Sequence, residues 1–239
     1  MPGHLSRHSH GLGGDFSAML LVDVGTAFWF GVYVLAIVQG LRQRTYAIPL
    51  VAICANFSWE LLAAVVTIAP VALWRIGDIV WLCLDAVIVW TLLRYGRAQQ
   101  SIPEIRRFYY PVIAVTFLFA LVVQYALDRA FEDRYGFIDA YLIAVMMSVL
   151  FFLMYFQRRN ADGYAYGIAW CKFLGNGLTS AGFVVIYQGL YRDANQTRLL
   201  LYVLCVACVM LDAGYVALLA HARRTDASSE RVAAASTAV

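Results

Sequence analysis

Seven long apolar segments dominate this sequence and constrain its fold more than any other feature. They comprise residues 16–38, 47–68, 72–93, 110–127, 138–156, 164–187 and 199–220. Each is close to the ~20 residues that a helix needs to cross a hydrocarbon core about 30 Å thick. The linkers are short, so consecutive helices must be antiparallel. The sequence therefore predicts an all-α membrane protein, a bundle of seven transmembrane helices.

Composition supports lipid as the solvent, because 62% of the 239 residues are hydrophobic and only 14% are charged. A soluble domain is nearer half apolar and a quarter charged. The net charge of +3 is modest and the arginines are scattered, so the bilayer is the expected partner and nucleic acid is not. The 17 arginines against a single lysine indicate a bacterial genome rich in G and C. We therefore expect a multi-pass protein of a bacterial cell membrane.

The polar ends and the loops predict domain boundaries and orientation. Residues 1–15 form a predicted N-terminal tail, residues 16–220 the transmembrane domain, and residues 221–239 a C-terminal tail. Alternate loops lie on the same side of the membrane. The loops of one side, together with the C-terminal tail, carry eleven arginines, and the N-terminal tail and the loops of the other side carry six. Because positively charged loops stay in the cytoplasm, the N-terminus is expected outside and the C-terminus in the cytoplasm. No loop could form a soluble catalytic domain, so any chemistry must lie among the helices.

Several ionisable residues lie inside the predicted segments, where each costs a few kcal/mol. They are Asp23, Glu60, Asp78, Asp85, Lys172 and Asp212. The acids outnumber the lysine, so some must be neutral or hydrogen-bonded at pH 7. A protonated carboxyl group in an apolar cavity is a potential proton donor. Hydrogen bonds that tie helices together are the alternative for Asp23 and Asn176, and an Asp85–Lys172 ion pair is a further structural alternative.

The second and third segments each carry one polar face. By i, i+3 and i+4 spacing, the members are Asn56, Trp59 and Glu60 in one and Asp78, Trp81 and Asp85 in the other. Counting ~1.5 Å per residue places Glu60 and Asp78 at a similar outer depth, and Asp212 deeper. The two faces are therefore expected to meet in a pocket closed to bulk water. There Asn56 would orient a Glu60 carboxyl group that stays protonated near neutral pH.

A short motif in this context resembles a known family. Asn56 to Glu60 form an N-x-x-W-E pattern, and the last segment contains Asp212. On a seven-helix chain of this length, the arrangement resembles the membrane-integral terpene cyclases of meroterpenoid and indole-terpenoid biosynthesis, over nearly the whole chain. The resemblance implies that a prenyl chain is cyclised after protonation of its terminal alkene or of an epoxide. It also implies that Glu60 and Asp212 are the catalytic acids.

The resemblance further implies a metal-independent, class II-like isomerase or lyase without a cofactor. The sequence has neither a D-x-D-D motif nor a D-D-x-x-D motif for magnesium and diphosphate. The expected substrate is lipophilic, a farnesyl chain on an indole, diketopiperazine or other aromatic core. Such a substrate would be supplied by a prenyltransferase or an epoxidase.

Aromatic faces stabilise carbocations by cation–π attraction, which suggests which side chains contact the substrate. The predicted substrate-binding residues are Asn56, Trp59, Asp78, Trp81, Asp85, Trp29, Lys172 and Asn176. Trp59 and Trp81 are favoured, because each shares a helix face with an acid. Asp212 is expected to line the floor of the pocket.

Two other functions fit a seven-helix bundle with buried acids. A proton-coupled transporter or channel uses such acids as relays, although the internal repeats typical of transporters are not visible in this sequence. A retinal protein needs a lysine in the last helix, one turn beyond the aspartate. That position is Val216, and the single lysine lies one segment earlier.

Overall fold

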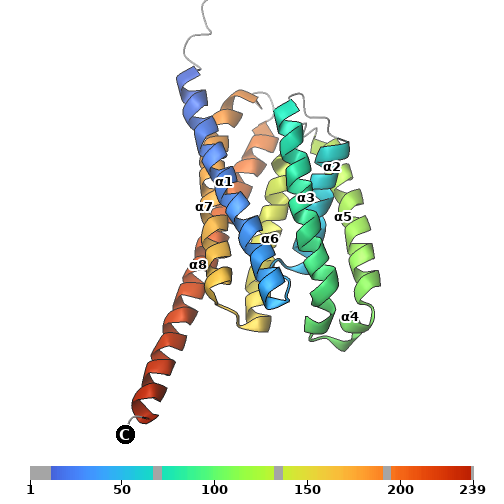
Figure 1. The fold of residues 1–239 in the computed structure, drawn as a ribbon. Helices are drawn as coiled ribbons and strands as arrows, with labels where there is room; N and C mark the ends of the chain where they lie inside the picture. Colours follow the sequence, from blue (N-terminus) through green and yellow to red (C-terminus); the bar gives the residue numbers. More distant parts are fainter. Residues whose placement is uncertain (1–11, 67–71, 132–136, 191–194, 238–239) are drawn as a thin grey trace, which may run out of the picture.

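The computed structural model describes residues 12–66, 72–131, 137–190 and 195–237, which are almost entirely helical (Figure 1). The helices are α1 (Leu12–Gln43), α2 (Leu50–Val65), α3 (Ala72–Tyr95), the 3-10 helix η1 (Gly96–Gln99), α4 (Pro103–Arg107), α5 (Tyr109–Phe131), α6 (Phe137–Arg158), α7 (Gly163–Leu190) and α8 (Asn195–Thr237). Each of the seven predicted segments coincides with one long helix, in the same order. The short helices η1 and α4 lie in the link between α3 and α5.

Helix length and hydropathy support a membrane protein. Within the described ranges, five helices are long and apolar enough to cross a membrane: α1, α3, α5, α6 and α8. The helix α2 is apolar but has only 16 residues. The predicted all-α class is therefore confirmed, whereas the count of seven spans and the orientation of the termini stay predictions.

The helices form two groups. In one group α1 packs along α7, α7 on α8, and α8 on α6; in the other, α2 packs on α3 and α5. Contacts of α1 with α3 and of α2 with α6 join the two groups. Buried apolar side chains from both groups share one large core cluster, and a smaller cluster lies between α6, α7 and α8. The polar residues described below lie inside this packed bundle.

The loops separate the arginines as predicted. The turn after α1, the link around α4, the turn after α6 and the C-terminal part of α8 all lie at the lower end of the bundle in Figure 1. This end, called the arginine-rich end below, carries the eleven arginines predicted for the cytoplasmic side. The helix α8 continues through most of the predicted C-terminal tail, to Thr237. Most of the predicted N-terminal tail lies outside the described residues.

Small residues let α1 and α7 pack closely. A Cβ atom at Gly182 of α7 would lie 2.7 Å from the carbonyl oxygen of Ala18 and 2.7 Å from Cγ2 of Val22, both on α1. Such close backbone approach is a common basis of helix association in membranes. The α1–α7 pair therefore depends on the absence of a side chain at this position.

We expect Gly182→Ala to destabilise the fold by about 1–3 kcal/mol, the usual cost of overpacking, because the new methyl group must displace backbone of α1. Gly177→Ala is the matched control on the same helix, since a Cβ atom there meets nothing within 4 Å. Thermal unfolding of the detergent-solubilised variants measures the difference. Equal melting temperatures for the two variants would contradict this description of the interface.

Candidate active site

A first polar cluster joins α2, α3 and α1. Glu60 and Asp85 are buried, with 5% and 0% of their surfaces exposed. The Asn56 amide donates hydrogen bonds to Asp85 Oδ2 at 2.8 Å and to the Tyr33 hydroxyl at 2.6 Å. The polar faces predicted for the second and third segments therefore meet.

Glu60 occupies an unusual position in this cluster. Its Oε2 atom is buried without a hydrogen-bond partner, as is Oδ1 of Asp85. Asn56, which bonds Asp85, lies one helical turn before Glu60 on α2, so Asp85 is an acid close to Glu60. Asp78 is half-exposed on α3. Within the described part of the chain the one ion pair is Lys172–Asp212. Glu60 and Asp85 are thus two buried carboxyl groups with no cationic partner there.

Aromatic rings lie beside these carboxyl groups. The ring of Trp81 packs edge-on against Tyr33, with centroids 4.7 Å apart, and against Phe30 at 6.2 Å. Trp59 is half-buried against the same apolar core. Because the Tyr33 hydroxyl is bonded to Asn56, the Trp81–Tyr33 pair is fixed next to the acids.

A second polar cluster surrounds Asp212 on α8. Lys172 Nζ lies 2.6 Å from Asp212 Oδ1, and the Ser148 hydroxyl donates to the same oxygen at 2.7 Å. The Asn176 amide donates to Asp212 Oδ2 at 2.7 Å. All four side chains are at most 4% exposed. Asp212 is therefore a buried carboxylate whose two oxygens are both hydrogen-bonded and whose charge is balanced by an ammonium group.

The structural alternative of an ion pair between Asp85 and Lys172 is wrong, because Lys172 pairs with Asp212 instead. Packing explains the difference: α7 lies against α1 and α8, whereas Asp85 on α3 faces α2. Asp23 belongs to neither polar cluster, since it is exposed on the surface of α1.

Two residues of α1 connect the clusters. Trp29 Nε1 donates to Asn176 Oδ1 at 3.0 Å, and Tyr33, one turn later, accepts the bond from Asn56. Lys172 Nζ also lies 6.0 Å from the centroid of the Trp29 ring. Residues four apart on a helix have Cβ atoms about 5–6 Å apart. The two clusters are therefore neighbours, contacted by residues of α1 that lie one helical turn apart.

Two members of these clusters were missed by the sequence analysis. Tyr33 carried a usable signal, because it follows Trp29 by one helical turn and so shares its face. Ser148 is the sole serine or threonine of α6, but nothing in the sequence indicated that it would contact Asp212. That contact depends on the packing of α6 against α8.

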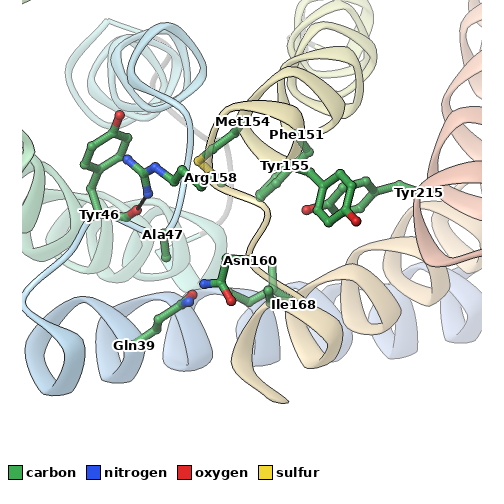
Figure 2. A pocket seen from close by; sticks show the side chains of 11 residues that line it. Gln39, Tyr46, Ala47, Phe151, Met154, Tyr155, Arg158, Asn160, Ile168 and Tyr215 are labelled. Carbon is green, nitrogen blue, oxygen red and sulfur yellow. Dashed lines mark hydrogen bonds between the residues drawn. The ribbon is translucent and has the colours of Figure 1, made fainter. Parts of the chain in front are cut away.

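A small pocket, which the sequence analysis did not predict, opens at the arginine-rich end (Figure 2). Polar side chains of Gln39, Arg158 and Asn160 line it together with apolar and aromatic side chains. Phe151 and Tyr215 lie on its inner side, with ring centroids 5.5 Å apart. Each is three residues along its helix from Ser148 or Asp212, so the pocket lies about one turn from the second cluster.

Comparison with known proteins identifies the family. The sequence profile of the Pyr4-like transmembrane terpene cyclases matches residues 16–225. The chain is 28% identical to the Pyr4-family terpene cyclase mfmH of Annulohypoxylon moriforme, over 66% of each chain. It is 26% identical to terpene cyclase macJ of Penicillium terrestre, over 62% of this chain and 58% of the relative. With terpene cyclase dpmaB of Metarhizium anisopliae it shares 24% identity, over 88% of this chain and 87% of the relative.

No solved structure matches the chain. The alignments cover less than two thirds of the first two relatives' own length, 66% of mfmH and 58% of macJ. These relatives are fungal, so the comparisons give no support to the predicted bacterial origin. The profile match includes all seven predicted segments and both polar clusters. The chain therefore belongs to the Pyr4-like transmembrane terpene cyclases.

Proposed function

We propose that this chain is a terpene cyclase that protonates the terminal alkene or epoxide of a prenyl chain attached to an aromatic core. The observation that carries the proposal is the buried Glu60 carboxyl group, which has one oxygen unpartnered and lies one helical turn from the Asn56 side chain that bonds a second buried carboxyl group, Asp85. Family membership and the names of the relatives support the reaction class.

Glu60 is proposed as the proton donor. Burial and a neighbouring carboxylate both favour the neutral form of a carboxyl group. Asp85 accepts a hydrogen bond from Asn56, which stabilises negative charge on Asp85. Of the two acids, Glu60 is therefore the one that holds the proton. Exclusion of water from this site protects the carbocation that follows protonation.

The proposed role of Asp212 differs from that of Glu60. Asp212 pairs with the buried ammonium group of Lys172 and accepts hydrogen bonds at both oxygens. We infer that Asp212 is a positioning residue rather than a proton donor. Through Asn176 it fixes Trp29, which with Trp81 and Tyr33 is proposed to stabilise the carbocation by cation–π attraction.

We expect Trp81→Leu to lower kcat about tenfold, because a lost cation–π contact of about 1–2 kcal/mol changes a rate by that order. Trp81→Phe retains an aromatic face and should lose less activity. Trp90→Leu is the matched control on the same helix, since Trp90 is 47% exposed on the outer surface. Equal losses in Trp81→Leu and Trp90→Leu, measured as initial rates, would remove Trp81 from the site.

Product analysis tests the function directly. Purified protein is incubated with farnesylated aromatic substrates, both as the terminal alkene and as the epoxide. Alkene protonation followed by cyclisation and loss of a different proton gives a product with the mass of its substrate. In D₂O that product should gain one deuterium on carbon, at the site of protonation. Absence of any cyclised product from either substrate form would reject the proposed function.

A further inference from the structure

The pocket at the arginine-rich end holds a cation with an unused hydrogen-bond donor. Arg158 Nη1 donates to the carbonyl oxygen of Tyr46 at 2.8 Å, and its guanidinium carbon lies 3.8 Å from the centroid of the Tyr46 ring. Nη2 is buried and has no hydrogen-bond partner. No acid pairs with Arg158 among residues 12–66, 72–131, 137–190 and 195–237. A buried donor without a partner costs about 1–3 kcal/mol, and more when it is charged.

The surroundings of Arg158 suit an amphiphilic ligand. Arg158 is the last residue of a candidate membrane span, Phe137–Arg158, so the pocket lies at the level where the hydrocarbon core ends. Phe151, Met154 and Ile168 provide apolar walls. Figure 2 shows Arg158 held against Tyr46 on one side of the pocket and Tyr215 on the other. A polar group bound here would extend its apolar part into the bundle.

We propose that this pocket binds an acidic oxygen of the substrate's core, a carboxylate or an enolate, with Arg158 as the anchor. The inference rests on the proposed function and specifies its substrate class. A guanidinium fork recognises such oxygens by charge-assisted hydrogen bonds. A plain indole offers an N–H donor instead, so it does not match Arg158. The pocket therefore favours an oxygen-bearing acidic core over the indole core expected from the sequence.

The spacing between this pocket and Glu60 agrees with a farnesyl chain. Ala47 lines the pocket just before α2, and α2 runs from Leu50 through Glu60. Ten residues of helix correspond to about 15 Å, which is the order of length of an extended farnesyl chain. An acidic core held at Arg158 would therefore place the far end of the chain at the level of Glu60.

Equilibrium binding tests the proposal without requiring turnover. The probes are a farnesylated hydroxybenzoic acid and its methyl ester, and the protein is embedded in nanodiscs of neutral lipid. Arg158→Gln is expected to weaken binding of the acid at least tenfold and binding of the ester less than threefold. Arg159→Gln is the matched control, because Arg159 is the exposed next residue, and it should bind both probes like wild type. Arg158→Lys keeps the positive charge but not the guanidinium fork. Its affinity for the acid should therefore lie between those of wild type and Arg158→Gln.

Two outcomes would overturn the assignment. Unchanged acid binding by Arg158→Gln, at wild-type thermal stability, would show that Arg158 is not the anchor. Displacement of the acid by phosphatidylglycerol in the nanodisc, dependent on Arg158, would assign the pocket to an anionic lipid headgroup. Failure of the proposed function looks different: the acid probe still binds through Arg158, but no prenylated substrate is cyclised.

Discussion

Glu60→Gln is expected to abolish turnover while the protein stays folded. The amide retains the size of the side chain but cannot deliver a proton, and general acid catalysis contributes about 10²–10⁴-fold to a rate. No cation within the described residues depends on Glu60 for charge balance, so its neutral replacement should leave the melting temperature near that of wild type. Initial rates of product formation and thermal unfolding measure the two quantities.

The matched control for this substitution is Asp23→Asn. Asp23 is also an acid within a predicted membrane segment, but it is exposed on α1. The turnover of the Asp23→Asn variant should therefore remain near that of wild type. If Glu60→Gln retains wild-type turnover and Asp85→Asn does not, the proton donor is Asp85. If both variants remain active, the cluster around Asn56 is not the site of protonation.

The seven helices could be predicted from the sequence because an apolar run of about 20 residues is a local property. The ends of the helices were less predictable. The helix α8 continues to Thr237 although its apolar run ends near residue 220, since a helix with polar side chains can extend beyond the hydrocarbon core. The polar faces of α2 and α3 were also predictable, because helical spacing groups their members on one side of each helix, and these two helices pack together.

The partner of Lys172 could not be predicted in the same way. Counting residues gives the depth of a side chain but not which of the other helices it faces. That choice depends on packing between helices distant in sequence, such as the close approach of α1 and α7 at Gly182. The pocket around Arg158 was missed for a related reason: it is formed by the ends of several helices and a turn, which share no sequence periodicity.

Asp212→Asn is expected to have the largest effect on folding. It leaves the buried ammonium group of Lys172 without an anion, and removal of one partner from a buried ion pair typically costs about 3–5 kcal/mol. A cost of this size should appear as a much lower melting temperature and a low yield of folded protein. Turnover would be lost as well, because Asn176 and Trp29 lose their fixed positions.

The double variant Lys172→Met with Asp212→Asn separates positioning from proton donation. Without the lysine, the asparagine no longer faces an unbalanced charge. It can still accept a hydrogen bond from the Ser148 hydroxyl and contact Asn176. Neutral replacement of both members of a buried pair is often tolerated, so the melting temperature should recover by more than half of the loss. If Asp212 acts through the position of Asn176 and Trp29, part of the turnover should return with stability. A double variant that is as stable as wild type but wholly inactive would instead make Asp212 a catalytic acid, because restored packing cannot replace a missing proton.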